Sequence, residues 1–150
     1  DARLQTSAPD IFAAAEVSEF RSHPQRPDQR KETWRNAEHQ GHHAALNLLG
    51  AELPFDSIPG FWSDHYDWGL QTCGQISSAA PSALRVTADG GFLMFYLDAE
   101  QHLQGACSWG QGTSMARDIK LCERLIASRT VLLVPGLIDA NVSLKQLLRN

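Results

Sequence analysis

The sequence of 150 residues lacks a long hydrophobic run and contains only three cysteines. No stretch approaches the roughly 18 apolar residues of a membrane helix, and the segment that starts at Asp1 has neither the basic start nor the apolar core of a signal peptide. We therefore predict a cytoplasmic protein without a membrane partner. Cys73, Cys107 and Cys122 are odd in number, widely spaced and form no C-x-x-C pair, which favours reduced, buried thiols over a disulfide framework or a metal site.

The sequence also lacks an excess of positive charge, because its net charge is −4 at pH 7. This balance argues against general nucleic-acid binding. The charge is unevenly distributed: residues 21–35 contain five basic and two acidic side chains and carry +3, whereas the remainder carries −7. Pro24 and Pro27 interrupt the polar segment 21–31, which has no apolar period and is therefore predicted to be an exposed loop.

With 43% hydrophobic residues, the chain can bury one substantial core but is too short for two complete nucleotide-binding domains. Residues 8–14 contain a short apolar run that predicts a brief buried strand. Thr33 is the predicted N-cap of a helix that ends before Gly50. The predicted apolar face of this helix consists of Trp34, Ala37, Gly41, Ala44, Ala45, Leu48 and Leu49. Gly41 on that face would let another backbone approach closely, because glycine otherwise costs a helix about 1 kcal/mol relative to alanine.

The segment 54–59, which begins and ends with proline, marks the predicted boundary before a second part. Four strand-like runs follow it, at residues 70–74, 84–87, 92–97 and 103–109. Tight turns at residues 89–91 and 98–101 predict an antiparallel meander, with 92–97 as a central strand covered on both faces. A helix is predicted to cover the sheet with a stripe of Met115, Ile119, Cys122, Leu125 and Ile126. Ser143 and Gln146 have the spacing of a capping box at the start of the last helix.

Several groups that could carry chemistry are better explained by structure alone. His39 and His43 have the i, i+4 spacing of a zinc pair, but no further ligand completes a site, so both are predicted, with His42, to be solvated surface residues. Gly110 and Gly112 precede a helix without the lysine of a phosphate-binding loop and indicate a simple turn. We therefore predict no metal site and no catalytic residue in this chain.

Two motifs, and the order of several shorter ones, carry a resemblance to a known family. The first is Glu32-Thr33-Trp34-Arg35-Asn36-Ala37, and the second is Phe61-Trp62-Ser63-Asp64-His65-Tyr66-Asp67. Further matches lie at residues 6–17, 92–98, 116–118, 124–126 and 143–145. The series resembles the C-terminal portion of FAD-dependent NAD(P)H:ferredoxin reductases of the putidaredoxin and rubredoxin reductase type. These enzymes serve oxygenase systems and belong to the pyridine nucleotide-disulfide oxidoreductase-like superfamily.

The resemblance implies an α+β fold in two parts. Residues 1–50 would be the C-terminal remnant of an FAD-binding domain, comprising its last strand and helix. Residues 54–150 would be the reductase C-terminal domain, an antiparallel β-sheet packed by helices and similar to a dimerisation domain.

The resemblance also implies four cofactor-binding residues: Glu16, Thr33, Trp34 and Trp62. Family members have glycine and aspartate where this chain has Ala15 and Glu16, and the aspartate hydrogen-bonds the ribityl or pyrophosphate region of FAD. Alanine resists the positive φ that glycine adopts, and the glutamate carboxylate extends one methylene further. Thr33 and Trp34 begin the helix whose N-terminal end faces the flavin ring in the family, and Trp62 would stand beside the flavin where electrons leave. A strand ending at a surface acid explains Glu16 as well, and a core aromatic explains Trp34.

The implied activity of the parent enzyme is hydride transfer from NAD(P)H to FAD, followed by electron delivery to a ferredoxin-type iron-sulfur protein. Ferredoxins are typically acidic, so residues 21–35 would provide electrostatic docking, with a solvated loop as the alternative. The chain contains no G-x-G-x-x-G motif, so we expect a missing FAD/NAD-binding segment or subunit to hold NAD(P)H. We expect the chain alone to be catalytically incomplete and not to bind FAD as the parent does. The alternative function is a non-catalytic interaction or dimerisation module, which would include a homodimer.

Overall fold

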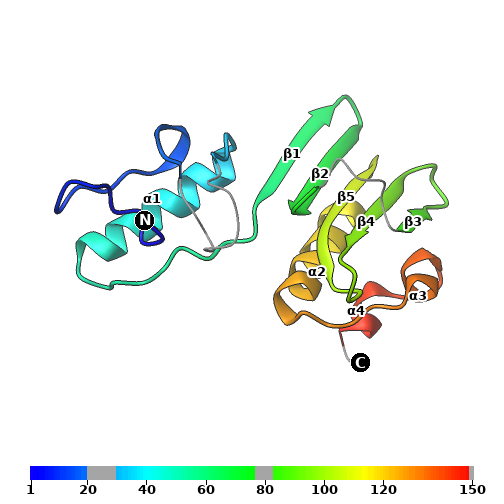
Figure 1. Cartoon of the computed structure of the whole chain (residues 1–150). Helices are drawn as coiled ribbons and strands as arrows, with labels where there is room; N and C mark the ends of the chain where they lie inside the picture. Colours follow the sequence, from blue (N-terminus) through cyan, green and yellow to red (C-terminus); the bar gives the residue numbers. More distant parts are fainter. Residues whose placement is uncertain (20–29, 77–82, 149–150) are drawn as a thin grey trace. The chain divides into compact units, whose positions relative to one another are not determined.

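The computed structural model describes residues 1–19, 30–76 and 83–148, and the chain divides into two compact units, Asp1–Pro59 and Gly60–Asn150 (Figure 1). The described part of the first unit contains the 3-10 turn η1 (Ala15–Val17) and the helix α1 (Trp34–Leu48). The described part of the second unit contains β1 (Gly60–His65), β2 (Trp68–Gly74), β3 (Ala83–Val86), β4 (Phe92–Leu97), β5 (Leu103–Gln111), α2 (Ser114–Ser128), α3 (Val134–Ile138) and α4 (Leu144–Leu147). Within these described ranges, every helix is too short or too polar to cross a membrane.

Helix α1 begins and ends where the sequence predicts. The Thr33 side chain accepts a hydrogen bond from the Asn36 amide and caps the first turn. After the helix, Gly50 takes a φ of 88°, a left-handed conformation that glycine adopts without a Cβ clash. Both helix ends are set by local chemistry, which is why capping residues and periodicity were sufficient to find them.

The buried side of α1 differs from the prediction. The buried residues of the helix are Asn36, Gln40, Ala44 and Asn47. Trp34 and Leu48 are exposed, and a Cβ added at Gly41 would meet nothing within 4 Å. The predicted apolar face and the predicted close backbone approach at Gly41 are therefore wrong for this chain.

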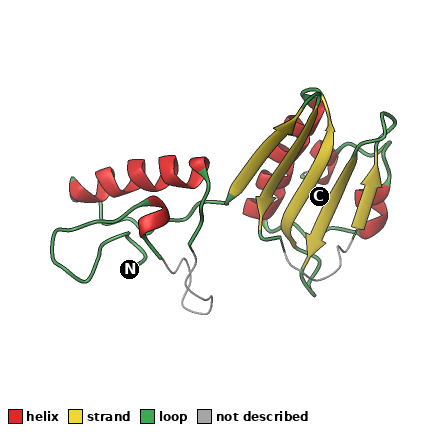
Figure 2. Ribbon diagram, turned by 90° about the horizontal axis from the view of Figure 1, so that it is seen from above, coloured by secondary structure: helices red, strands yellow, loops and turns green. Residues whose placement is uncertain are grey.

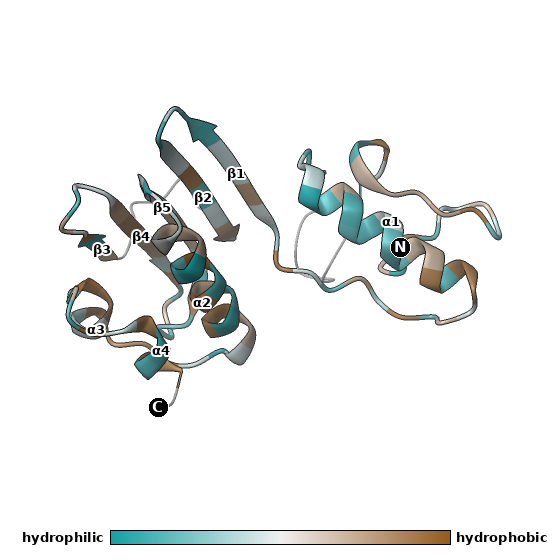
Figure 3. Ribbon diagram, turned by 180° about the vertical axis from the view of Figure 1, so that it is seen from behind, coloured by the Kyte–Doolittle hydropathy of each residue, from teal (hydrophilic) through white to brown (hydrophobic). Residues whose placement is uncertain are grey.

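The polar side of α1 turns inward because its amides hydrogen-bond to the backbone of neighbouring loops. Asn47 Nδ2 donates to Arg3 O at 2.8 Å and to Leu53 O at 2.9 Å, and Asn47 Oδ1 accepts from the Leu53 amide at 2.8 Å. Asn36 Nδ2 donates to Lys31 O at 3.0 Å. A small apolar core of Leu4, Ala44 and Phe55, with Phe12 and Ala14 packed against it, completes the unit. The loops thus satisfy their backbone groups, while the C-terminal end of α1 presents hydrophobic residues outward (Figure 3).

The short strand predicted at residues 8–14 is not formed. A single isolated bridge joins Gln5 and Phe12, and η1 follows directly (Figure 2). A strand requires a hydrogen-bonded neighbour along its length, and in the described part of the first unit only that bridge supplies one. The apolar pattern alone was therefore insufficient for a strand.

The second unit is built on a five-stranded antiparallel sheet in the order β1-β2-β5-β4-β3. Strands β3, β4 and β5 form a meander through the two predicted turns, where Thr87 N donates to Gly91 O at 2.9 Å and Gln101 N to Asp98 O at 3.1 Å. The four-run meander was nevertheless wrong, because β2 pairs with β5 and not with β3, and β1 was not predicted as a strand.

The middle strand is β5, and β4 is an internal strand between β5 and β3. The sequence favoured residues 92–97 as central because they are apolar on both faces, yet only Leu93 and Phe95 are fully buried. Phe92, Met94 and Tyr96 on the other face are half-buried. A strand's composition indicates how apolar its faces are, but the choice of neighbours depends on hydrogen bonding to distant segments.

Helix α2 covers one face of this sheet, as predicted. Met115, Ile119, Cys122 and Leu125 of the predicted stripe are buried, and Ile126 is half-buried. Gly110 of β5 lets α2 pack closely, because a Cβ there would lie 2.9 Å from Met115 Cγ. The capping box of α4 is also confirmed: Ser143 N donates to Gln146 Oε1 at 3.2 Å, and Ser143 Oγ accepts from the backbone of the first turn.

Arg85 of β3 attaches the last part of the chain to the sheet. Its guanidinium is buried and donates to Leu137 O at 2.6 Å, Gly136 O at 3.0 Å and Val142 O at 3.0 Å. It also lies over the Phe95 ring at 5.9 Å from the centroid. Burial lowers the pKa of Arg85 from its ordinary value, against the nearby charge of Asp118. One side chain therefore connects the sheet to α3 and to the loop before α4.

Candidate functional site

The turn η1 has an unusual backbone conformation at its first residue, Ala15. Ala15 has a φ of 68°, in the left-handed region that favours glycine. Its amide donates to Gln40 Oε1 at 2.7 Å, and its carbonyl accepts from Ser18 N at 3.1 Å and Ser18 Oγ at 2.9 Å. The expected resistance of alanine to this conformation is thus overcome by hydrogen bonds on both sides of the residue. Glu16, the next residue, is exposed.

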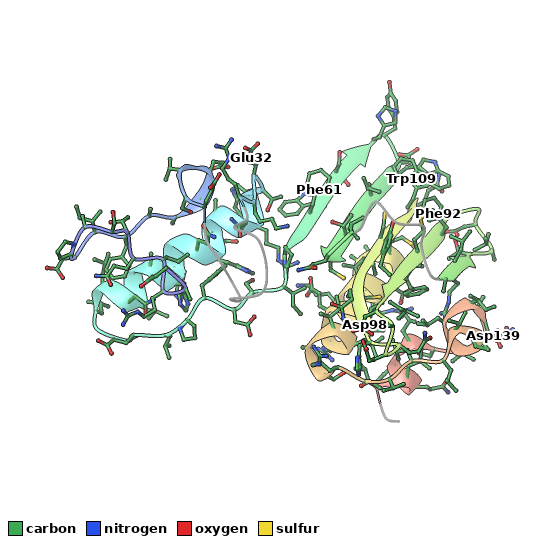
Figure 4. All side chains as sticks on the ribbon, viewed as in Figure 1. Glu32, Phe61, Phe92, Asp98, Trp109 and Asp139 are labelled. Carbon is green, nitrogen blue, oxygen red and sulfur yellow. The ribbon has the colours of Figure 1, made fainter. Side chains whose placement is uncertain are left out.

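The N-terminal end of α1 carries the second pair of predicted site residues. Thr33 is half-buried and uses its hydroxyl oxygen as the helix cap, while Trp34 is the first helical residue and is 67% exposed. Glu32, labelled in Figure 4, accepts hydrogen bonds from Arg30 Nε at 2.8 Å and from a terminal guanidinium nitrogen of Arg30. This hydrogen bond, followed by the charge of Glu32, raises the pKa of Arg30. The acid therefore offsets one positive charge of the basic segment.

The structure describes residues 30–35 of the basic segment 21–35. Arg21, Arg26 and residues 21–29 of the predicted loop lie outside the described residues. Of the remaining basic residues, Arg30 is exposed, whereas Lys31 and Arg35 are half-buried. The expectation of a docking loop consequently stays a prediction.

The aromatic motif at residues 61–67 forms β1 and the turn to β2. Trp62 pairs with Gln71 and is 47% exposed, and its neighbour Phe61, labelled in Figure 4, points to the opposite face of the strand. At the tip of the hairpin Tyr66 has a φ of 54° and is 92% exposed, and the His65 ring lies edge-on to it with centroids 4.7 Å apart. The sequence identified these aromatics but not the strand that presents them.

The face of the sheet opposite α2 is apolar and only partly covered. Trp68 and Trp109 stack on this face with centroids 5.5 Å apart and planes 17° from parallel. Phe92 is the cross-strand neighbour of Trp109, and Figure 4 shows the two on adjacent strands. Leu84 and Val86 on β3 are exposed. The sequence did not predict this surface. Its side chains come from four strands, and the order of those strands in the sheet could not be read from the sequence.

Two half-buried groups on the same face titrate abnormally. Burial raises the pKa of Tyr96, and the charge of Cys107 acts in the same direction. Burial also raises the pKa of Cys107, followed by the charge of Cys73. Both groups are therefore neutral over a wider pH range than in solution.

The three cysteines are free thiols, as predicted, and they differ in exposure. Cys73 and Cys122 are buried between the sheet and α2, whereas Cys107 is half-buried on the other face. Cys73 Sγ lies 3.8 Å from Ile119 O of α2. A hydrogen bond with Cys73, followed by burial, raises the pKa of Cys122 well above its ordinary value. Cys73 and Cys122 are therefore hydrophobic core residues.

The histidines of α1 are more structural than predicted. His39 Nδ1 lies 2.9 Å from Ser57 Oγ, and His43 Nε2 lies 2.8 Å from Leu53 O and is edge-on to the Phe55 ring. The prediction that His39 and His43 are merely solvated is therefore wrong, because the segment 53–57 runs along their side of the helix. Their i, i+4 spacing places both toward that segment.

A cluster that could ligate a cation lies in the β4–β5 turn, at Asp98, Glu100 and His102. Asp98 accepts hydrogen bonds from the amides of Glu100 at 3.1 Å and His102 at 2.7 Å, and from Gln104 Nε2 at 2.8 Å. Burial opposes ionisation of Asp98, but hydrogen bonding and charge from His102 outweigh it and lower the pKa of the carboxyl group. Asp98 therefore stabilises the β4–β5 turn through these hydrogen bonds, and this structural role accounts for its presence.

The predicted site residues belong to different units. Glu16, Thr33 and Trp34 lie in the first unit, and Trp62 lies in the second. Within the first unit, Gln40 connects α1 to the Ala15–Ser18 turn. Sequence reasoning missed Gln40, although the polar residues Asn36, Gln40 and Asn47 recur at helical spacing and were the available signal.

Comparisons with known proteins agree with this architecture. The chain is 34% identical, over 149 residues, to the ferredoxin-NAD(+) reductase component of the anthranilate 1,2-dioxygenase system of Burkholderia cepacia. That match covers 99% of this chain and 36% of the relative, so the chain spans about a third of the relative's length.

Solved structures agree on the fold. The ferredoxin reductase for the CYP199A2 system from Rhodopseudomonas palustris matches 97% of this chain and 35% of its own length, with a TM-score of 0.83 and 28% identity. The reductase in a covalent putidaredoxin reductase-putidaredoxin complex matches 98% of this chain and 34% of its own length, with a TM-score of 0.81 and 26% identity. The sequence model of the family described as "Reductase C-terminal" matches residues 60–148. The chain therefore belongs to the reductase C-terminal family.

Proposed function

We propose that this chain is the C-terminal part of a flavin-dependent ferredoxin reductase. In this role it shapes the flavin environment and the ferredoxin-docking side during electron transfer from NAD(P)H through FAD to an iron-sulfur protein. The residues 1–50 would be the C-terminal remnant of the FAD-binding domain, and residues 54–150 the reductase C-terminal domain. The names of the relatives as ferredoxin reductase components of dioxygenase systems support the assignment.

The observation that carries the proposal is the conformation of Ala15. A positive φ is expected where the family has glycine. This chain keeps a positive φ there, although alanine adopts that conformation only at an energetic cost. Strained backbone conformations concentrate at ligand sites, so the retained turn favours a flavin-facing role over a non-catalytic module. A left-handed Ala15 also sends Glu16 to the surface, where its carboxylate can accept a hydrogen bond from a ribityl hydroxyl group.

The other proposed cofactor contacts follow from helix and strand geometry. Thr33 fixes the first turn of α1, whose remaining amide groups and positive helix end favour electron density on a reduced flavin. Trp34 and Trp62 each present a large exposed aromatic surface that can pack beside a planar ring. Bound flavin accepts a hydride and releases single electrons, and these residues would orient it and limit its contact with water.

The remaining parts of the activity lie beyond these 150 residues. The chain contains no G-x-G-x-x-G sequence, so the FAD pyrophosphate and NAD(P)H would be held by the missing FAD/NAD-binding segment or subunit. The acceptor would be a ferredoxin-type protein, steered in part by the basic residues 21–35. A homodimer through the second unit is compatible with this assignment and would not replace it.

A chimera tests the proposal. In it, this chain replaces the matching 149-residue region of the Burkholderia cepacia relative. We expect the purified chimera to carry flavin, seen in its visible absorption spectrum, and to reduce both a small artificial acceptor and a ferredoxin with NAD(P)H. The relative truncated before that region is the control and should lose both reactions. The 150-residue chain mixed with FAD should retain no stoichiometric flavin, and tight binding would show that it is more complete than proposed.

Substitution of Trp62 separates the two parts of the proposal. Trp62→Ala in the chimera should slow ferredoxin reduction more than it slows reduction of the flavin by NAD(P)H. Phe61→Ala, at the neighbouring aromatic on the opposite face of β1, is the matched control. A folded chimera without flavin would contradict the flavin-facing role, and one that reduces the small acceptor but no ferredoxin would contradict the docking role.

A further inference from the structure

Gln40 is a fully buried polar residue of α1, with 0% of its surface exposed. Its Oε1 accepts one hydrogen bond from the Ala15 amide at 2.7 Å and a second from Ser18 Oγ at 3.3 Å. These two donors lie at the start and just after the end of η1. A single side chain of α1 therefore holds the turn from both ends.

Ala15 requires such a contact because its φ of 68° is strained for any residue with a Cβ. Strained backbone conformations persist only where the surrounding structure fixes them, and they concentrate at ligand sites. Ser18 contributes from the other side, with its amide and hydroxyl both bonded to Ala15 O. Gln40 Oε1 accepts from the Ala15 N–H and fixes the peptide plane before the N–Cα bond, while Ser18 holds the carbonyl after it, and together they fix φ.

The opposite end of the Gln40 amide shows that packing does not explain the residue. Its Nε2 is buried and has no hydrogen-bond partner among residues 1–19, 30–76 and 83–148. A buried donor without a partner destabilises a fold. Asn36 and Asn47, by contrast, use their amide nitrogens to bind loop carbonyls. A leucine or methionine would fill the Gln40 volume without the unsatisfied donor, so the oxygen is the group that distinguishes glutamine here.

We propose that Gln40 is a positioning residue that keeps Ala15 in the left-handed conformation and thereby directs Glu16 toward its ligand. Glu16 follows Ala15 directly, so the backbone conformation of Ala15 sets the direction in which the chain presents the Glu16 side chain. The step to the ligand rests on the proposed function, in which that ligand is the flavin cofactor. The step from Gln40 to Ala15 does not.

The first experiment tests the step from Gln40 to Ala15 in the 150-residue chain. It compares the wild type with Gln40→Met, Ala15→Gly and the double variant. Methionine matches glutamine in length but has no carbonyl acceptor, and glycine adopts positive φ unaided. We expect NMR three-bond couplings to report positive φ at residue 15 in the wild type and in Ala15→Gly, a negative φ in Gln40→Met, and a positive φ again in the double variant. Glu38→Met, at an exposed position of the same helix, is the control and should leave φ unchanged.

Two results would overturn this step. If residue 15 keeps a positive φ in Gln40→Met, the turn holds itself and Gln40 does not position it. If the double variant fails to recover a positive φ, the loss of Gln40 changes more than the conformational preference of residue 15, and the proposal in this form is wrong.

The second experiment introduces the same substitutions into the flavin-binding chimera. Gln40→Met should raise the FAD dissociation constant roughly five- to tenfold, the size of one lost orienting hydrogen bond, and Ala15→Gly in addition should restore it to within about twofold. If FAD affinity ignores Gln40→Met while φ changes, Gln40 does not position Glu16 for flavin. If the unmodified chimera takes up no flavin, the proposed function fails, while the NMR couplings still decide the role of Gln40.

Discussion

Arg85 has a buried guanidinium whose three described hydrogen bonds all end on backbone carbonyls. Arg85→Met fills a similar volume but leaves the carbonyls of Gly136, Leu137 and Val142 without their donor. We expect a loss of about 3 kcal/mol in the free energy of unfolding, measured by urea denaturation. Arg117→Met removes an exposed arginine and should change stability by less than about 0.5 kcal/mol. Equal effects of the two substitutions would show that Arg85 does not hold the C-terminal segment.

The raised pKa of Cys122 predicts that the free energy of unfolding decreases at alkaline pH. Its folded-state pKa is raised by the hydrogen bond with Cys73 and by burial, so the folded protein keeps this proton when the unfolded chain loses it. The contribution of Cys122 to the free energy of unfolding is therefore fully present below the ordinary thiol pKa of 9.0. It declines as pH rises from there toward the folded-state pKa. Urea denaturation between pH 7 and about pH 10 measures the decline.

Cys122→Ala is the control for this pH dependence. Tyr96 and Cys107 also have raised pKa values and contribute to the decline in both proteins. The difference between the wild type and Cys122→Ala isolates the thiol of Cys122, because the variant should lose less stability over the same pH interval. Parallel curves would contradict a raised pKa at Cys122.

At the scale of single residues, the sequence was informative where a side chain acts on its own neighbourhood. Thr33 and Ser143 bind amide groups within three residues, and both caps were predicted correctly. Gln40 binds a residue 25 positions away, and the helical spacing of Asn36, Gln40 and Asn47 indicates a polar face without identifying that partner. The flavin-binding roles of Glu16, Thr33, Trp34 and Trp62 stay predictions.

At the scale of elements, Gly41 gives the clearest test of how α1 is used. A Cβ at Gly41 would meet nothing within 4 Å, so Gly41→Ala should stabilise this chain by about 0.5 to 1 kcal/mol through higher helix propensity. In the chimera, the same substitution should instead weaken flavin content if another backbone approaches the helix there. Urea denaturation of the chain and absorption spectra of the chimera are the measurements.

Gly105→Ala is the matched glycine substitution on β5. A Cβ at Gly105 would collide with the carbonyl oxygen of Gln75, and backbone cannot move aside easily. We expect a loss of at least about 2 kcal/mol. Destabilisation by Gly41→Ala of similar size would mean that the space around Gly41 is filled in this chain.

Periodicity predicted helices better than strands for a physical reason. The stripe of α2 is a property of one segment that packs on whichever sheet face is nearby, and four of its five predicted residues are buried. Residues that pair between β2 and β5 are more than thirty positions apart in the chain, and no pattern within either strand selects the other. For the same reason β1 was read as an aromatic motif rather than as an edge strand.

At the scale of the whole molecule, the two units should differ in independent stability. The described core of the first unit contains Leu4, Ala44 and Phe55, and a segment of about 60 residues is marginal without a larger core. The second unit has a five-stranded sheet covered by α2 over one face. We expect residues 60–150 alone to unfold cooperatively in urea, and residues 1–59 alone to show no cooperative transition.

Circular dichroism and urea titration of the two separate segments provide this measurement. The full 150-residue chain is the reference for the second unit, whose transition should be retained in the isolated segment. Cooperative unfolding of residues 1–59 would contradict the prediction. It would also weaken the proposal that this segment is the remnant of a larger flavin-binding domain.

The sequence by itself determined the caps of α1 and α4, the turns of the β3–β5 meander, the buried stripe of α2 and the family resemblance, because each depends on residues close together in the chain. The tertiary structure alone decided the strand order, the inward-facing polar side of α1 and the positive φ of Ala15. These features depend on hydrogen bonds between distant segments, such as that between Gln40 and Ala15. The free energy of such contacts is realised only after both segments are in place, so no local pattern encodes it.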